Sequence, residues 1–186
     1  TSSQSKEEAP VVTVVQDTVP STIYLLFVGD LMQHQSQIDA AKRAEGYDYT
    51  ASFLHVKDEI EKADIAIGNL ECSLGGKPYA GYPCFSAPDE FLFAIHNAGF
   101  DMLNTANNHC LDRGSKGGIR TIQLLDSLSI PHLGTYPDSA TQVRKHPLII
   151  EQKGFKLAFV AYTYATNGIK AAPPFRVNYI EEKRMA

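Results

Sequence analysis

The feature that most constrains the fold is a regular alternation of short apolar runs with longer amphipathic segments. The apolar runs have the length and composition of strands, and they lie at residues 23–28, 65–67, 101–105 and 131–134. The segments between them space their apolar residues as helices do, at residues 36–44, 52–63, 89–98 and 115–128. This alternation predicts an α/β fold with a mostly parallel sheet, in the order β-α-β-α-β-α-β. A hairpin is predicted to follow, from strands at 148–151 and 155–162.

Two details of the pattern carry further expectations. The run from Ile23 to Val28 has no polar interruption, which predicts a strand that is buried on both faces. The segment 52–63 is predicted to form one amphipathic helix. The residues expected on the inward face of that helix are Phe53, Val56, Ile60 and Ala63.

A polar cluster stands at the carboxyl end of each of the first three predicted strands. These clusters are Gly29-Asp30, Gly68-Asn69-Leu70-Glu71 and Asn107-Asn108-His109. In an open parallel sheet, ligands bind outside the carboxyl ends of the strands. We therefore expect these side chains, although far apart in the sequence, to meet on one rim of the sheet.

The residue types in the three clusters suit a divalent cation. Asp30 and Glu71 offer hard anionic oxygens, and Asn108 can add a neutral amide oxygen. Two carboxylates held close together without a cation would repel each other, and one would take up a proton. A metal ion would remove that repulsion and could activate a water molecule. His109 could then protonate a leaving group or stabilise an oxyanion, with Asp112 orienting its imidazole.

Each of these residues also has a simpler structural explanation. Asp30 could cap the following helix, Glu71 could pair with a surface lysine, and Asn107-Asn108 could form a turn. Among the remaining histidines, only His34 is close enough in sequence to Asp30 to reach the same rim. The residues expected to contact the substrate or to support the metal ligands are His34, Asn69 and Asn107.

Composition excludes several classes of protein. The hydrophobic fraction of 44% and the charged fraction of 20% are typical of a soluble globular domain. The formal net charge is −4, and the basic residues are scattered, so nucleic acid is not expected as a partner. No apolar run approaches the roughly 18 residues that cross a bilayer. An acidic polymer as a partner would require a local cation or a basic pocket.

The ends of the chain and its cysteines give more limited expectations. The opening Thr1–Glu8 is polar and charged, which predicts a flexible tail over 1–21 and a folded domain over 22–186. That tail could be a membrane tether left after removal of a signal or lipoprotein segment, or an ordinary frayed terminus. Cys72 and Cys84 flank a loop rich in Gly, Pro and Tyr, and they could close it as a disulfide or be two unrelated small residues.

Taken in chain order, the motifs resemble those of the CapA-type (PGA_cap) family of bacterial capsule synthesis proteins. Gly29-Asp30-Leu31-Met32 resembles the opening GD-x-M element of the family, and Gly68-Asn69-Leu70-Glu71 resembles its N-L/F-E element. Residues 106–114 resemble its A-N-N-H-x-x-D-x-G element, and Phe85-Ser86-Ala87-Pro88 fits its F-x-x-P segment. The resemblance extends over roughly residues 22–180.

The family is similar to the calcineurin-like metallophosphatases, which hold two metals at strand ends. The resemblance therefore implies a metallophosphatase-like α/β sandwich and two divalent ions of the Mn, Fe or Zn type. Its motifs place Asp30, Glu71 and Asn108 as metal ligands and His109 as the catalytic histidine. It also implies a role in making, exporting or anchoring a poly-γ-glutamate capsule outside the cytoplasm, at the cell surface or in the periplasm.

One departure from the family pattern concerns its later histidine elements, an H-W-G-x-E segment and a G-H-x-H-like segment. Neither stands in this chain. We expect the chain to be truncated before them, within a helix that begins near Glu181, and the sandwich to be incomplete at its C-terminus. Metal is then expected to bind this chain weakly or not at all.

Three functions agree with these observations. The first is a metal-dependent surface hydrolase of capsule metabolism that acts on phosphoester or amide bonds. The second is a non-catalytic protein that binds or assembles an acidic polymer in its cleft. The third is a general metallophosphodiesterase with no connection to capsule.

Overall fold

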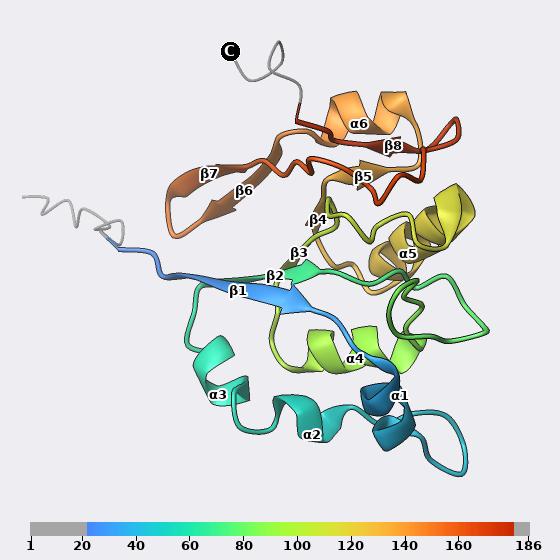
Figure 1. Cartoon of the computed structure of the whole chain (residues 1–186). Coiled ribbons are helices and arrows are strands. Elements are labelled where there is room, and N and C mark those ends of the chain that lie inside the picture. Colours follow the sequence, from blue (N-terminus) through green and yellow to red (C-terminus); the bar gives the residue numbers. More distant parts are fainter. Residues whose placement is uncertain (1–21, 181–186) are drawn as a thin grey trace, which may run out of the picture.

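Four parallel strands form the centre of the fold, in the spatial order β1-β2-β3-β4. We describe residues 22–180 from a computed structural model (Figure 1). The four strands are β1 (Leu25–Leu31), β2 (Ile65–Leu70), β3 (Met102–Asn104) and β4 (His132–Leu133). Every neighbouring pair is parallel, which confirms the α/β prediction. The predicted tail at 1–21 and the predicted helix that begins near Glu181 lie outside the described residues.

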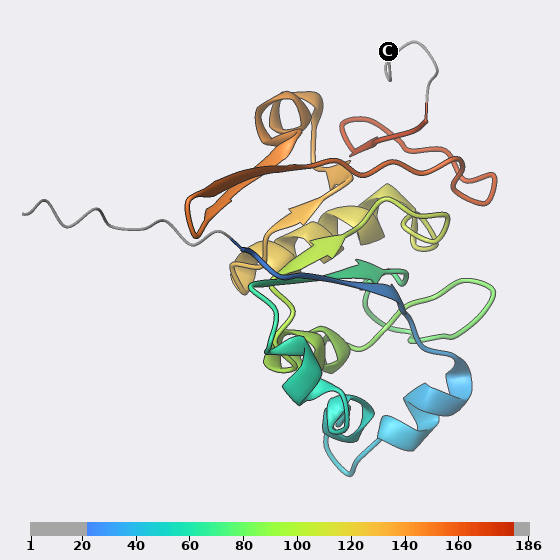
Figure 2. The ribbon, with the colours of Figure 1, turned by 90° about the vertical axis from the view of Figure 1, so that its left-hand side faces the viewer.

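Helices connect the strands and cover one face of the sheet. These helices are α1 (Gln35–Ala41), α2 (Thr50–Phe53), α3 (Lys57–Ile60) and α4 (Asp89–Asn97). Figures 1 and 2 both show α1 to α4 on the same side of the sheet. The main core lies between them, where Ala66 and Leu103 of the sheet belong to the same buried cluster as Leu92 and Ile95 of α4. The longest helix, α5 (Gly114–Ser127), precedes β4.

A hairpin covers part of the opposite face of the sheet. It consists of β6 (Leu148–Gln152) and β7 (Phe155–Phe159), which pair antiparallel as predicted. A smaller core forms there, where Leu157 and Phe159 pack against Ile67, Met102 and Leu133 of the sheet. Figure 2 shows the hairpin on the side of the sheet away from α1 to α4.

Three elements were not predicted from the sequence. The short strands β5 (Thr135–Tyr136) and β8 (Arg176–Val177) pair antiparallel with each other. Helix α6 (Ser139–Lys145) follows β5, and the carboxylate of Asp138 caps its first turn by accepting from the Thr141 N–H. Two-residue strands carry no alternation that a sequence pattern could reveal. No helix among residues 22–180 is long and apolar enough to cross a membrane.

The prediction that the first strand is buried on both faces is wrong. Strand β1 lies at the edge of the sheet, and its side chains are largely exposed, with Phe27 66% exposed and Tyr24 before it 65% exposed. The strand also continues beyond Gly29-Asp30 to Leu31. An uninterrupted apolar run therefore marks an edge strand here. Phe27 stays exposed although the hairpin covers the same face of the sheet at Ile67 and Met102.

The predicted helix over 52–63 divides into α2 and α3. Turn residues separate the two helices, and Leu54 and Val56 are 64% and 47% exposed. The predicted inward position of Val56 is therefore wrong, whereas Ile60 is buried in the main core as expected. The break turns α3 so that Ile60, rather than Val56, faces the sheet.

Candidate functional site

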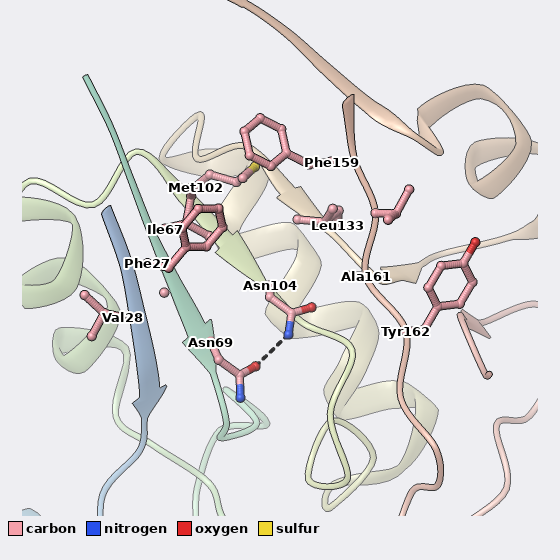
Figure 3. Close-up of a pocket in the computed structure, with 12 residues that line it drawn as sticks. Phe27, Val28, Ile67, Asn69, Met102, Asn104, Leu133, Phe159, Ala161 and Tyr162 are labelled. Atoms are coloured by element: carbon pink, nitrogen blue, oxygen red, sulfur yellow. Dashed lines mark hydrogen bonds between the residues drawn. The ribbon is translucent and has the colours of Figure 1, made fainter. Parts of the chain in front are cut away.

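Three polar side chains lie side by side across the sheet at the carboxyl ends of its strands. Asp30 of β1 stands opposite Asn69 of β2, and Asn69 stands opposite Asn104 of β3. Paired residues on neighbouring strands project their side chains to the same face. This row therefore continues the face that carries Ile67 and Met102, the face on which the hairpin packs (Figure 3).

Asn69 connects the members of this row and one further carboxylate. Its side-chain nitrogen donates to Asp30 Oδ1 at 2.8 Å and to Glu71 Oε2 at 3.1 Å. Its side-chain oxygen accepts from Asn104 Nδ2 at 2.8 Å and from Asn107 Nδ2 at 3.1 Å. Because the amide nitrogens of Asn104 and Asn107 can only donate, they fix which end of the Asn69 amide faces the carboxylates.

The two carboxyl groups held by Asn69 have pKa values that shift in opposite directions. The hydrogen bond from Glu71, followed by that from Asn69, lowers the pKa of Asp30. Burial, followed by the neighbouring Asp30, raises the pKa of Glu71 to about 7. The raised pKa of Glu71 thus comes first from burial, and the nearby carboxylate of Asp30 adds to it. The conflict between the carboxylates expected from the sequence is thus present in the structure.

His109 is fixed beside this pair by a buried carboxylate. The imidazole is only 7% exposed, and its Nδ1 lies 2.8 Å from Asp112 Oδ2. The same oxygen of Asp112 accepts from the backbone N–H of Phe85 at 2.7 Å. Since a carboxylate only accepts, Nδ1 of His109 carries a proton and its Nε2 presents a lone pair. The expected orienting role of Asp112 agrees with this contact.

The backbone at His109 is connected to the Asn69 network through Asn107. The His109 N–H donates to Asn107 Oδ1 at 3.1 Å, and Asn107 Nδ2 donates both to Asn69 and to the Leu70 carbonyl. Asn107 is buried. Asn107 therefore holds Asn69 and the His109 backbone in place from the interior, and it does not form the open surface of the site.

The remaining predicted residues lie at the margins of the site. His34 is exposed at the start of α1, and its ring centroid lies 5.5 Å from that of Phe85. The fully buried Phe85 in turn contacts His109 edge-on at 4.7 Å, so it separates the two histidines. Asn108 is half-buried and donates to Asn167 Oδ1 at 3.4 Å.

Two participating residues were not predicted from the sequence, Asn104 and Asn167. Asn104 ends the third strand two residues before the Ala106–Gly114 motif, and only the strand register reveals that it faces Asn69. Asn167 comes from a distant loop, and its side chain lies 3.4 Å from Nδ1 of His109. A polar residue at the end of a buried strand was the available signal for Asn104. The sequence held no comparable signal for Asn167.

The carboxylates at this rim are oxygen donors of the type that divalent cations prefer. Asp30 and Glu71 supply oxygens whose mutual repulsion a cation would relieve. Within residues 22–180, however, no three side chains of His, Cys, Asp or Glu gather in a metal-binding cluster. The described residues thus resemble part of a metal site and do not complete a two-metal set.

The loop between Cys72 and Cys84 is not closed by a disulfide in the structure. All three cysteines are free, with Cys72 and Cys110 buried and Cys84 exposed. Arg120 anchors the loop instead, by donating to the Leu74 carbonyl and to both oxygens of Asp89 at 2.7 Å each. A bidentate ion pair of this kind replaces a covalent link as the fixed point of the loop.

Comparison with protein families decides the relationship of the chain. The family described as bacterial capsule synthesis protein PGA_cap matches residues 24–184. The chain belongs to this family. The resemblance inferred from the motifs at Asp30, Glu71 and His109 is thereby confirmed.

Individual relatives agree with this assignment. The chain is 30% identical over 153 residues to the capsule biosynthesis protein CapA of Bacillus anthracis, which covers 76% of this chain and 36% of that protein. It is 32% identical over 101 residues to the uncharacterized protein y4uA of Sinorhizobium fredii, covering 50% of this chain and 22% of that one. The uncharacterized protein y4sH of the same organism is 33% identical over 91 residues, covering 44% and 20%. The chain therefore spans 36% or less of the length of each of these relatives.

Proposed function

We propose that this chain carries the strand-end half of the active site of a metal-dependent hydrolase in capsule polymer metabolism. The bond cleaved would be a phosphoester or an amide of an acidic polymer such as poly-γ-glutamate. The observation that carries the proposal is the pair Asp30 and Glu71, held by one amide beside a histidine that a carboxylate orients. Membership of a capsule synthesis family supports the biological setting, and that setting favours a location in the cell envelope.

The chemistry available to His109 follows from its hydrogen bonds. With Nδ1–H bonded to Asp112, Nε2 is the atom that can accept or deliver a proton. The Asp112 carboxylate would stabilise the imidazolium that forms when Nε2 takes up a proton. Burial of the ring and its contact with Phe85 restrict its rotation. His109 is therefore suited to protonate a leaving-group oxygen or nitrogen that approaches from the open side of the rim.

Asp30 and Glu71 would hold the cation, and Asn108 would provide a neutral oxygen. A bound divalent ion would polarise the scissile group and lower the pKa of a bound water. Asn69 would keep one oxygen of each carboxylate occupied, which leaves Asp30 Oδ2 and Glu71 Oε1 for the ligand. In this arrangement the Asn69 amide sets the separation of the two acids.

The experiment uses the full-length protein that contains this chain. Metal content and hydrolysis of bis(p-nitrophenyl) phosphate are measured for the native protein and for Asp30→Ala and His109→Ala. We expect Asp30→Ala to lose metal and activity together, and His109→Ala to keep metal but lose activity by a factor on the order of 100 or more. Activity that neither substitution reduces would exclude the proposed hydrolase function.

A second function is favoured by the incomplete donor set. Because no three acids, histidines or cysteines gather among residues 22–180, the cleft could serve to hold an acidic polymer without cleaving it. Full-length protein that binds polymer but no stoichiometric metal would support this role. A general phosphodiesterase would instead cleave the model diester and show no affinity for capsule polymer.

A further inference from the structure

A second hollow, separate from the strand-end site, lies between α6 and β8. Its volume is about 820 Å³. The polar residues that line it include Ser139, Gln142, His146, Tyr162, Arg176 and Asn178. None of the described residues lining it is acidic. We refer to this hollow as the Arg176 pocket.

A chain of hydrogen bonds fixes the direction of the protons on one wall of the Arg176 pocket. Gln142 Nε2 donates to Asn178 Oδ1 at 2.7 Å, so the amide nitrogen of Asn178 faces Nδ1 of His146, 3.2 Å away. Nδ1 of His146 is therefore an acceptor, and the proton of the neutral ring resides on Nε2. Burial lowers the pKa of His146, in agreement with a neutral ring.

This chain of bonds ends at a hydroxyl group that faces the hollow. Nε2 of His146 lies 3.0 Å from the Tyr162 hydroxyl, and that nitrogen donates. The Tyr162 oxygen thus accepts one hydrogen bond from the protein, and its own O–H remains to donate to a ligand. Asn178 is only 4% exposed. Solvent therefore does not compete for its amide, and the direction of the hydrogen bonds from Asn178 to His146 and Tyr162 stays fixed.

The opposite wall provides a positive charge. Nε of Arg176 donates to Ser139 Oγ at 2.8 Å and Nη1 donates to the Phe175 carbonyl at 3.1 Å. Among residues 22–180, no carboxylate pairs with Arg176 and no hydrogen bond occupies its Nη2. Since Ser139 Oγ accepts from Arg176, its O–H is also left to donate. The pocket therefore presents donors and a cation.

The Arg176 pocket is connected to the strand-end site through Tyr162. That residue also lines a neighbouring hollow of about 360 Å³, whose other residues include Asn69 and Asn104 (Figure 3). An extended ligand could pass from the Asn69 row along this hollow to Arg176. A small ligand could not contact both ends at once.

We infer that the Arg176 pocket binds a side-chain carboxylate of an extended acidic ligand whose reacting bond lies at Asp30 and Glu71. The inference rests on the proposed function for the position of the reacting bond. One guanidinium edge with two hydroxyl donors matches the two oxygens of a planar carboxylate. A phosphate group, which has more oxygens to satisfy, would leave acceptors unpaired in the same place.

Binding of a fluorescently labelled, γ-linked glutamate oligomer to the full chain tests this inference. We expect Arg176→Gln to weaken binding about tenfold or more, because a hydrogen bond to a charged group is lost. Tyr162→Phe, which removes only the hydroxyl, should weaken binding about fivefold. Arg144→Gln on the exposed side of α6 is the matched control for loss of one positive charge, and it should leave the affinity unchanged.

Three results would overturn the inference. Unchanged binding in both Arg176→Gln and Tyr162→Phe excludes the pocket, and Tyr162→Phe decides the matter if circular dichroism shows that Arg176→Gln is unfolded. Equal affinity for a neutral glutamine oligomer excludes a carboxylate. Tighter, Arg176-dependent binding of polyphosphate assigns the pocket to phosphate.

The same titrations separate the pocket from the hydrolase proposal. Arg176-dependent binding by a full-length protein that lacks hydrolytic activity would refute the hydrolase and retain the pocket. Metal-dependent hydrolysis of the model diester, together with polymer binding that does not depend on Arg176, would refute the pocket and retain the hydrolase.

Discussion

Asn104 donates its side-chain N–H to Asn69 Oδ1 across two paired strands, at a distance of 2.8 Å. This single bond helps to decide which end of the Asn69 amide meets the two carboxylates. Asn69 with its amide reversed would place an oxygen against Asp30 and Glu71, where all groups accept. The arrangement of the acids thus depends on a residue that touches neither of them.

Replacing Asn104 by Ala tests this dependence. We expect the free energy of unfolding to fall by about 1 kcal/mol, because hydrogen bonds to Asn69 and to the Ala106 N–H are lost. Urea denaturation measures the change. Asn97→Ala, at an exposed position on α4, should stay within about 0.5 kcal/mol of the native protein. An equal effect of both substitutions would show that Asn104 has no special role.

The raised pKa of Glu71 predicts a pH-dependent stability. Its pKa is about 7 in the folded protein, compared with an ordinary value of 4.5. Between these values the folded state holds a proton that the unfolded state has lost, so the stabilisation present below pH 4.5 disappears as the pH rises through 7. The lowered pKa of Asp30 acts at lower pH, since its contribution is lost as the pH falls below the ordinary value near 3.8.

Glu71→Gln isolates this effect. The neutral side chain keeps its shape and has no proton to lose, so the decline in unfolding free energy between pH 5 and pH 8 should become shallower than in the native protein. Glu59→Gln on exposed α3 serves as the control, because the Glu59 carboxylate lies on the surface with Lys62 as its partner. Identical pH profiles for native protein and Glu71→Gln would contradict the raised pKa of Glu71.

Asp112→Asn should weaken both the fold and the orientation of His109. The native carboxylate oxygen accepts from the Phe85 N–H and from the His109 ring. An amide oxygen in the same place carries no charge, so it would bind both donors more weakly. We expect a loss of about 1–3 kcal/mol. In NMR spectra, the His109 Nδ1–H signal should broaden or disappear. A sharp, unshifted signal would show that another group orients the ring.

Gly118→Ala should disturb the packing of α5 on Phe175, which belongs to a buried cluster with Leu111 and Ile122. A Cβ at Gly118 would lie 2.4 Å from a ring carbon of Phe175, which is fully buried. Overpacking of this kind costs about 1–3 kcal/mol. Gly29→Ala provides the contrast, because nothing lies within 4 Å of its added Cβ. Thermal unfolding of the two variants should therefore differ clearly.

Sequence periodicity was sufficient for the parts of the fold that repeat. The four parallel strands, the hairpin and the convergence of Asp30 and Glu71 follow from apolar runs that end in polar clusters. Periodicity could not distinguish an exposed edge strand from a buried one, since Ile23–Val28 looks the same in both cases. It also could not place Asn104 or Asn167, because their roles depend on strand register and on a distant loop.

The irregularity in β1 determines to which face of the sheet the Asp30 carboxylate points. Phe27 pairs with Ile67, and Asp30 pairs with Asn69. Between these two pairs β1 advances by three residues, whereas β2 advances by two. One extra residue lets Asp30 point to the same face as Phe27, although the two residues are three positions apart and a regular strand would place them on opposite faces. A regular strand of the same residues would turn Asp30 toward the helix-covered core. A change that straightens β1 without shortening it is therefore expected to be more harmful to this site than most substitutions in it.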